Sequence, residues 1–264
     1  MAEVLLQMEK LEKVFGGVRA VSDLDGYVNS GELVGLIGPN GSGKTTTLNL
    51  VSGVLAPSGG RIRFRGKDIG GDTPADNARL GMCRTFQNIR LFPDLSVADN
   101  VAVGLHMRHG AGLIAGLLTL PAARKAERDI RVRAREALAT VGLADRAEDL
   151  ISNLPYGDQR LVEIARALAT EPVLLLLDEP AAGMNPQETQ QLGETIRALS
   201  RDLGLAVLLV EHDMKLVMSI CERLIVINHG QLLASGTPQE VSANPEVVAA
   251  YLGSGKRRRE ASHA

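Results

Sequence analysis

The sequence contains few of the residues on which several classes of protein depend. It has no Trp, only 3% aromatic residues and two cysteines, Cys83 and Cys221, whose spacing matches no metal or redox motif. The scarcity of aromatics means that the core has to be built from aliphatic side chains. Cys221 follows Met214, Val217 and Met218 at helical intervals, which predicts that its thiol packs in that core.

Long apolar runs and a strong charge of one sign are also absent. No run reaches the roughly 18 apolar residues that span a bilayer, and the amino end, with Glu3, lacks the pattern of a signal peptide. The formal net charge of −2 gives no reason to expect a nucleic-acid partner, because such proteins are usually strongly basic. With 45% hydrophobic and 23% charged residues, the composition is that of a globular protein. We expect a cytoplasmic protein that does not bind nucleic acid.

Strand patterns occur on both sides of a central polar stretch. Arg61 to Arg65 alternates polar and apolar residues after Gly59-Gly60, which predicts a half-buried antiparallel strand near the amino end. The nearly all-leucine run Val173 to Leu177 predicts a strand that is buried on both faces, as in a parallel sheet. Further short apolar runs predict buried strands over 32–37, 205–210 and 224–228.

Helical patterns alternate with these strands. Apolar residues recur at intervals of three or four, or good helix formers dominate, over 48–55, over 124–140 as far as Gly142, and over 192–203 as far as Gly204. This alternation predicts an α/β fold with a parallel sheet core and an antiparallel β part at the amino end. We expect one domain over 1–252, with a core from 1–87 and 154–252, a helical insertion over 88–153, and a basic, disordered tail over 253–264.

A glycine-rich segment connects the predicted strand 32–37 to the helix that follows it. Its sequence, Gly38 to Thr45, fits the pattern G-x-x-x-x-G-K-[ST]. Glycines let successive backbone N–H groups turn toward one point, and the following helix adds its positive amino end, so the segment can bind phosphate. Lys44 can reach the β- and γ-phosphates, and the Thr45 hydroxyl can ligate Mg²⁺. The predicted nucleotide-binding residues are Gly38, Pro39, Asn40, Gly41, Ser42, Gly43, Lys44, Thr45 and Thr46.

Two carboxylates follow the leucine-rich strand. Asp178 and Glu179 come directly after Val173 to Leu177, and the carboxyl ends of central parallel strands face the crevice where ligands bind. Asp178 suits Mg²⁺, directly or through water, and Glu179 suits the water that attacks the γ-phosphate. A strand end capped by two solvated acids is the alternative, and the phosphate loop beside it argues against that alternative.

Taken in order, the motifs resemble those of the ATPase subunits of ABC transporters over about residues 4–253. They are Phe15, the phosphate loop, Arg84-Thr85-Phe86-Gln87, Leu154-Pro155-Tyr156-Gly157-Asp158-Gln159-Arg160, Asp178-Glu179, Ala182-Gly183-Met184-Asn185-Pro186 and Val210-Glu211-His212-Asp213. The resemblance implies a P-loop, RecA-like core that binds ATP and Mg²⁺ and hydrolyses ATP.

The resemblance also implies roles for single residues. Phe15 would stack on adenine, although it could equally belong to the core. Glu179, His212 and Gln87 would be catalytic, with His212 hydrogen-bonded to the γ-phosphate and Gln87 reaching the attacking water and sensing a membrane partner. The implied metal ligands are Thr45, Gln87 and Asp178.

The segment Pro155, Tyr156, Gly157 and Asp158 precedes a predicted helix and resembles the family's signature. In the family, this helix end binds the γ-phosphate held by another protomer, so the resemblance implies a dimer with two composite sites. The usual pattern begins Leu-Ser-Gly-Gly-Gln, whereas this chain has Pro155 in place of the serine and Asp158 in place of the glutamine. A hydroxyl donor is lost and a negative charge is added, from which we expect a weaker ATP-bound dimer.

Asn185 replaces a frequent aspartate in the loop after Glu179. Together with Pro186 and Glu188, it predicts a helix cap.

Within the family, three features look most like branched-chain amino-acid importers. They are the loop 181–186, the run 211–218 and the end 244–253, and the long insert with its apolar run Leu113 to Leu120 fits that group too. The implied partners are a second ATPase chain, identical or related, membrane permease subunits and, indirectly, a solute-binding protein, at the cytoplasmic face of the membrane. Urea, amide and other amino-acid importers and lipid exporters use similar subunits. A non-transport ABC protein of DNA repair or translation and an inactive regulatory cassette are the more distant alternatives.

Overall fold

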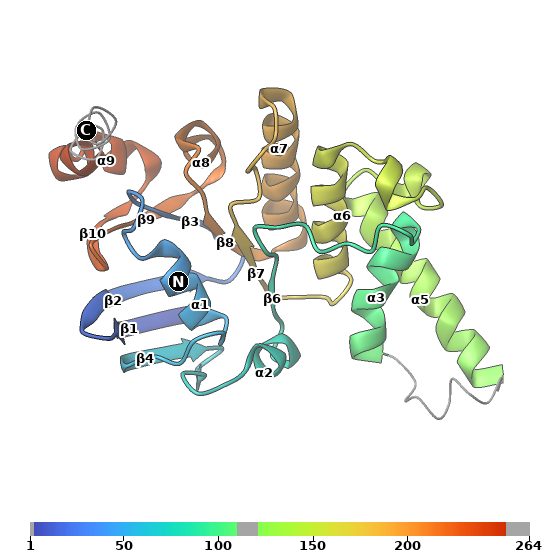
Figure 1. Cartoon of the computed structure of the whole chain (residues 1–264), viewed down its shortest axis with the longest axis horizontal. Coiled ribbons are helices and arrows are strands. Elements are labelled where there is room, and N and C mark those ends of the chain that lie inside the picture. The colour runs from blue at the N-terminus through green and yellow to red at the C-terminus, as the bar shows by residue number, and fades with distance from the viewer. Residues whose placement is uncertain (1–2, 110–120, 252–264) are drawn as a thin grey trace.

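The computed structural model describes residues 3–109 and 121–251, which form two β-sheets surrounded by helices (Figure 1). The strands are β1 Val4–Phe15, β2 Val18–Asn29, β3 Leu33–Ile37, β4 Gly59–Phe64, β5 Lys67–Asp68, β6 Met82–Arg84, β7 Leu174–Asp178, β8 Ala206–Val210, β9 Arg223–Asn228 and β10 Gln231–Gly236. The helices are α1 Lys44–Val51, α2 Pro74–Arg79, α3 Val97–His109, α5 Pro121–Thr140, α6 Tyr156–Leu168, α7 Pro186–Leu203, α8 Met214–Ile220 and α9 Pro238–Ala243, with short 3-10 turns η1 Ala144–Arg146 and η2 Ile151–Asn153.

The larger sheet has six strands in the order β10-β9-β3-β8-β7-β6. Strands β9, β3, β8, β7 and β6 run parallel, which confirms the predicted parallel core. The edge strand β10 runs antiparallel to β9. Strand β10 was not predicted, because its half-exposed pattern lacks the continuous apolar run of a central strand.

The smaller sheet has four strands in the order β2-β1-β4-β5, all antiparallel. The predicted strand over 61–65 lies within β4 and the residue after it, where Ile62 and Phe64 are buried and Arg61, Arg63 and Arg65 are not. The alternation therefore turns one face of this sheet inward, as the period of two predicted.

The central parallel strands β3, β7 and β8 are buried on both faces, as their apolar runs predicted. In β7, Leu174 and Leu176 belong to the hydrophobic cluster shared with the antiparallel sheet and α1, whereas Leu175 and Leu177 belong to the cluster shared with α6 and α7. Successive side chains of a strand point to opposite faces. Cys221 is buried in the second cluster, which confirms its predicted packing, and burial raises its pKa to about 12.

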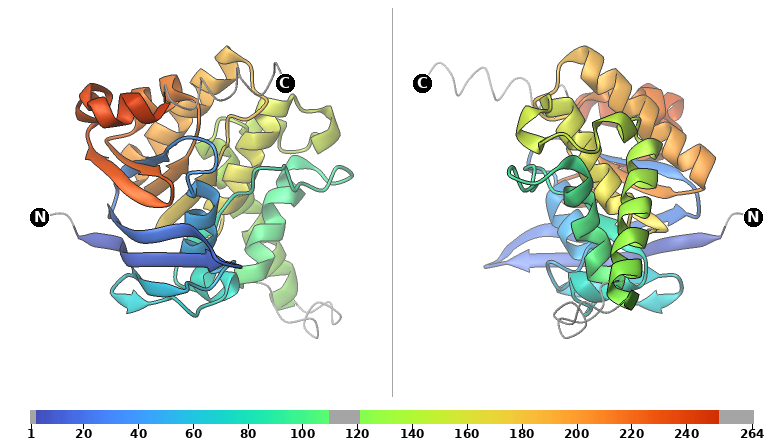
Figure 2. Two further views of the ribbon diagram at one scale, coloured as in Figure 1. Left: turned by 60° about the vertical axis from the view of Figure 1, so that its left-hand side comes forward. Right: turned by 90° about the vertical axis from the view of Figure 1, so that its right-hand side faces the viewer.

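Helix α1 lies between the two sheets, because it contacts β2 on one side and β7 and β8 on the other. Helices α3, α5 and α6 pack against one another beside the edge strand β6, and Figures 1 and 2 show them as a group at one end of the molecule. None of the helices in the described ranges combines the length and the apolar character needed to span a bilayer.

One predicted helix end differs from the structure. Helix α1 ends at Val51 rather than continuing to Leu55, because Ser52 caps it and Gly53 then takes φ 78°. Leu55 still packs against the core from the loop, which explains why its apolar character suggested a helix. The predicted ends at Thr140 and at Gly204 are confirmed. The run Leu113 to Leu120 and the tail 253–264 lie outside the described residues.

Candidate functional site

The phosphate loop connects β3 to α1 through two glycines that no other residue could replace. A Cβ atom on Gly38, where φ is 155°, would lie 2.0 Å from the carbonyl oxygen of Ile227. A Cβ atom on Gly43, where φ is 104°, would lie 2.6 Å from the carbonyl oxygen of Ala20. Both glycines are therefore required by close approach of neighbouring backbone, and Gly41 at φ 77° adds a third left-handed turn.

The Lys44 amine turns back over this loop. Its Nζ donates to the carbonyl oxygen of Gly38 at 2.7 Å and to that of Pro39 at 3.1 Å. Burial lowers the pKa of Lys44, and the negative charge of Glu179 opposes that shift. The Ser42 hydroxyl in the same loop is buried and has no hydrogen-bond partner among the described residues. A buried donor without a partner is rare, so the loop is suited to an anion that would accept from it.

Asp178 ends β7 and is buried, with 6% of its surface exposed. Its Oδ2 accepts a hydrogen bond from Nη2 of Arg84 at 2.8 Å. Arg84 ends the neighbouring strand β6, and its Nη1 also donates to Asn49 Oδ1 in α1 at 2.7 Å and to Oγ of Ser52, the C-cap of α1, at 2.8 Å. No role was predicted for Arg84, although a charged residue shortly before Phe86-Gln87 was an available signal.

Glu179 follows Asp178 and meets the other two predicted catalytic residues. Its Oε2 accepts from Nε2 of Gln87 at 2.9 Å and lies 3.8 Å from Nδ1 of His212. Glu179 has φ 47°, an uncommon conformation for a residue with a side chain, and its backbone N–H donates to Val210 at 2.8 Å. Such strain is concentrated at functional sites. The structure thus brings Gln87, Glu179 and His212 together, although they are far apart in sequence.

Glu211 orders the backbone around this group. It is 1% exposed, and its Oε1 accepts from the backbone N–H of Ala181 at 2.8 Å. Its Oε2 accepts from the backbone N–H groups of His212 at 2.9 Å and Asp213 at 3.3 Å. Glu211 belongs to the motif Val210-Glu211-His212-Asp213, but no role was predicted for it. Its place between a buried strand and a histidine was the available signal.

The signature segment forms the amino end of α6, as predicted. Pro155 is the N-cap residue, and Asp158 lies in the first turn. The segment lies beside the loop after Glu179, since a Cβ atom on Gly183 would lie 3.5 Å from the Tyr156 ring. Figure 1 shows α6 and α1 on opposite sides of β6 and β7, so within one chain the signature does not face the phosphate loop.

A buried ion pair ties α6 to the loop that carries Gln87. Arg160 and Glu163 each have 3% of the side chain exposed and pair at 2.9 Å. Arg160 also donates to the carbonyl oxygen of Phe86 at 3.0 Å and to that of Gln87. Glu163 accepts from the backbone N–H of Arg90 at 2.8 Å. Neither residue was assigned a role from the sequence, because their contacts with the Gln87 loop lie more than 70 positions away.

Two further predictions concern exposed residues. Phe15 ends β1 with 45% of its surface exposed, so it does not belong to the core, and the Lys13 amine lies 5.2 Å from its ring centre. Asn185 caps α7 by accepting from the backbone N–H groups of Gln187 and Glu188, while Glu188 accepts from Asn185. The predicted capping arrangement is confirmed.

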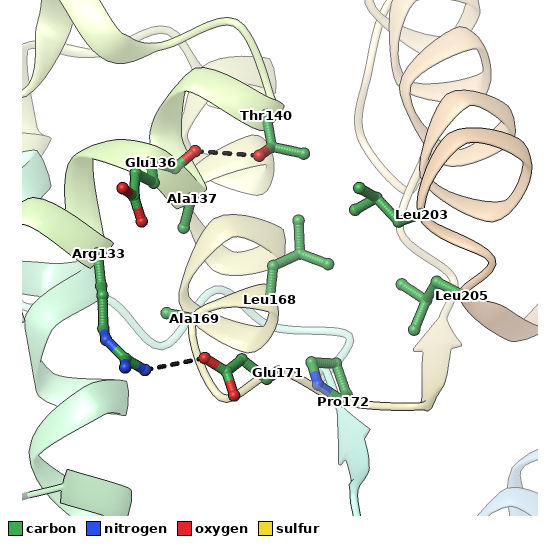
Figure 3. A pocket seen from close by; sticks show the side chains of 10 residues that line it. All are labelled: Arg133, Glu136, Ala137, Thr140, Leu168, Ala169, Glu171, Pro172, Leu203 and Leu205. Carbon is green, nitrogen blue, oxygen red and sulfur yellow. Dashed lines mark hydrogen bonds and ion pairs between the residues drawn. The ribbon is translucent and has the colours of Figure 1, made fainter.

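A cavity of about 270 Å³ lies elsewhere, between α5, the end of α6 and the turn from α7 to β8 (Figure 3). Pro172, which precedes β7, contributes to its lining, so the cavity lies at the amino end of that strand. Asp178 and Glu179 lie at the carboxyl end. The cavity is therefore not part of the site around the phosphate loop.

Comparison with known proteins places this arrangement in a family. The profile of the family described as ABC transporter matches residues 21–182. Among solved structures, an ATP-binding cassette of an ABC transporter in its ADP conformation has a TM-score of 0.83 and 31% identity, with 95% of this chain and 99% of that chain covered. A nucleotide-free cassette has a TM-score of 0.81 and 30% identity, with 94% and 98% covered. The chain belongs to the ABC transporter family, as one of its ATP-hydrolysing cassettes.

Within that family, its similarity is to a particular group. The profile described as branched-chain amino acid ATP-binding cassette transporter matches residues 231–257. The high-affinity branched-chain amino acid transport ATP-binding protein LivG of Salmonella typhimurium is 46% identical, over 96% of this chain and 99% of its own length. LivG of Escherichia coli K12 is 45% identical and BraF of Pseudomonas aeruginosa is 44% identical, with the same coverage.

Proposed function

We propose that the chain is the ATP-binding and ATP-hydrolysing subunit of an importer for branched-chain or related amino acids. Similarity of 44–46% over nearly full length to LivG and BraF supports this, as does the match at 231–257 to the branched-chain group. The observation that most directly supports ATPase activity is that Gln87, Glu179 and His212 lie together. They lie at the edge of the parallel sheet where the phosphate loop also begins.

The residues around the phosphate loop fit ATP with Mg²⁺. Thr45 supplies an exposed hydroxyl, and Asp178 and Gln87 supply carboxylate and amide oxygens, the ligand types that Mg²⁺ prefers. The described residues contain no cluster of three His, Cys, Asp or Glu side chains that could hold a metal. This fits Mg²⁺, which is usually held by one or two side chains together with phosphate oxygens. Bound there, Mg²⁺ would neutralise charge on the phosphates.

The protein groups then have separate roles in hydrolysis. Residues Gly38 to Thr46 hold the phosphates, and Lys44 exchanges its two loop carbonyl acceptors for phosphate oxygens. Glu179 orients the attacking water and accepts its proton, and Gln87 is hydrogen-bonded to Glu179 where it can contact the same water. His212, with 60% of its side chain exposed beside Glu179, donates to the γ-phosphate. Phe15 presents an exposed ring to adenine.

The signature segment supports a dimer. Pro155 to Asp158 lie at the end of α6 across the sheet from α1, so a phosphate held by Lys44 can meet such a segment only from a second ATPase chain, identical or related. We propose that the chain works as one domain over 1–252, in which the insertion 88–153 contacts a membrane permease at the cytoplasmic face of the membrane. A solute-binding protein would supply the permease. ATP would close the two ATPase chains by binding the closed state more tightly than the open one.

The proposal is tested by ATP turnover and ATP-dependent dimerisation of the purified chain, beside Glu179→Gln. We expect the wild type to hydrolyse ATP and Glu179→Gln to accumulate as an ATP-bound dimer in sedimentation velocity. If neither happens until a related ATPase chain and its permease are added, the second chain is a different protein. Absence of ATP binding by the wild type under both conditions would contradict the proposal. Uptake of labelled leucine, compared with urea, into proteoliposomes containing the complete transporter tests the substrate.

A further inference from the structure

Arg84 lies where three elements around the proposed metal site meet, namely its own strand β6, the end of β7 and helix α1. It pairs in the β6–β7 ladder with Leu176, and side chains two residues apart in a strand share a face, so Arg84 lies on the same face of the sheet as Asp178. That face is covered by α1, because Leu176 and Leu48 share one hydrophobic cluster. The guanidinium is therefore held between the end of β7 and the helix that begins at the phosphate loop.

The contacts of the guanidinium are specific. The terminal nitrogen Nη2 donates to Asp178 Oδ2, and Nη1 donates to Asn49 in α1 and to its C-cap residue Ser52. The side chains of Arg84 and Asp178 are 9% and 8% exposed, so water does not screen their interaction strongly. Among the described residues, Arg84 is the one side chain that donates to the Asp178 carboxylate.

We propose that Arg84 is the positioning residue of the metal site. It fixes Asp178 through Oδ2 and ties that carboxylate to α1, so that the carboxylate and the Thr45 hydroxyl keep one relative geometry. The inference rests on the proposed function, in which Asp178 and Thr45 serve Mg²⁺. Metal-binding carboxylates depend on such outer partners, whose loss costs about 10–100-fold in metal affinity or activity.

Lysine cannot take the place of this arginine. Its ammonium is a single point charge, whereas the planar guanidinium contacts Asp178, Asn49 and Ser52 at once. A purely structural tie would lower the stability of the fold without changing how binding depends on Mg²⁺. The Mg²⁺ dependence therefore separates the two roles.

The test measures binding of a fluorescent ATP analogue to the purified full chain as Mg²⁺ is titrated, and again in EDTA. For Arg84→Met, we expect the half-saturating Mg²⁺ concentration to rise about 10–100-fold while binding in EDTA is unchanged. Arg84→Lys is expected to give a smaller rise. Arg79→Met is the matched control, because Arg79 lies on α2 with 76% of its side chain exposed, and it should behave as the wild type.

The outcomes separate this proposal from the general function. A wild type without Mg²⁺-dependent binding of the analogue contradicts the proposed ATPase site itself. A wild type that binds normally, together with a folded Arg84→Met of unchanged or lower Mg²⁺ requirement, overturns the role of Arg84 alone. If Arg84→Met does not fold by circular dichroism, Arg84→Lys decides the question, and an unchanged Mg²⁺ requirement in that variant overturns the proposal.

Discussion

At the scale of single residues, Glu211 joins two loops through one buried carboxylate. It accepts from the backbone of Ala181, in the loop after Glu179, and from the backbone of His212. Hydrogen bonds to a charged acceptor are stronger than neutral ones, and a buried N–H left without a partner is costly. Glu211 thus holds together the backbones that carry two of the proposed catalytic side chains.

Replacement of Glu211 should affect both stability and activity. Glu211→Ala leaves the N–H groups of Ala181 and His212 without their acceptor, so we expect a loss of roughly 2–4 kcal/mol in the free energy of unfolding, measured in urea. The kcat for ATP should fall as well, because His212 loses its fixed place. Glu194→Ala, an exposed change on α7, is the control. Wild-type stability in Glu211→Ala would show that other contacts order these loops.

Residues of contiguous motifs could be predicted from the sequence, whereas their partners could not. Strand patterns alone placed the phosphate loop and Asp178-Glu179 at the ends of buried strands, and the resemblance to the family supplied the role of His212. Arg84 and Arg160 make their contacts 94 and 73 or 74 positions away, respectively. Such contacts depend on strand order and on the packing of α6, which side-chain periodicity does not encode.

At the scale of elements, the amino end of α6 differs from the family's usual signature. Pro155 is an N-cap without a side-chain hydrogen bond, and Asp158 places a carboxylate in the first turn. The helix itself tolerates both residues, because a proline needs no N–H there and an acid is favoured by the helix dipole. A phosphate from a second chain, however, would meet one donor fewer and one negative charge more.

We therefore expect Pro155→Ser combined with Asp158→Gln to strengthen the ATP-bound dimer. A hydrogen bond to a charged group contributes about 1.5–3 kcal/mol, which corresponds to a dimer dissociation constant lower by tenfold or more. Both forms are compared in a Glu179→Gln background by sedimentation at several ATP concentrations. Equal or tighter dimerisation of the natural sequence would rule out this explanation, and unfolding in urea checks that α6 is intact.

The middle of α6 anchors the Gln87 loop through Arg160 and Glu163. Arg160→Met leaves Glu163 as a buried charge without that partner, so we expect a loss of about 3–5 kcal/mol in the free energy of unfolding. Arg160→Met with Glu163→Leu should recover part of this stability, because the buried carboxylate is removed together with its partner, although the more exposed Arg166 also loses its contact with Glu163. ATP turnover should not recover, since the carbonyl groups of Phe86 and Gln87 still lack their donor. Recovery of turnover together with stability would show that the anchor has no part in placing Gln87.

At the scale of the whole molecule, periodicity predicted the layers but not their arrangement. Apolar runs buried on both faces required helices above and below a parallel sheet. They did not indicate that an antiparallel sheet would cover α1, or that β10 would extend the parallel sheet in the opposite direction. Both features depend on which sheet edges and helix faces remain exposed after the other elements have packed. The pattern of a single segment does not contain that information.

Within one chain, the fold places the phosphate loop and the signature segment apart. This arrangement predicts how mixtures of two inactive variants should behave. Lys44→Ala should inactivate each site that uses the altered loop, and Gly157→Asp each site that uses the altered signature. Either variant alone then has no intact site. In a mixed dimer, both defects fall in one composite site and the other site is intact.

Mixing equal amounts of the two variants should therefore restore ATP turnover. If chains pair at random, half of the dimers are mixed and each has one intact site of two, so we expect about a quarter of the wild-type rate. The control is wild type with an excess of Lys44→Ala, whose mixed dimers also have one intact site and show whether a single site can hydrolyse ATP. If that control is active and the two-variant mixture is not, the signature and the phosphate loop do not complete one site across two copies of this chain, and the composite-site arrangement is wrong for it.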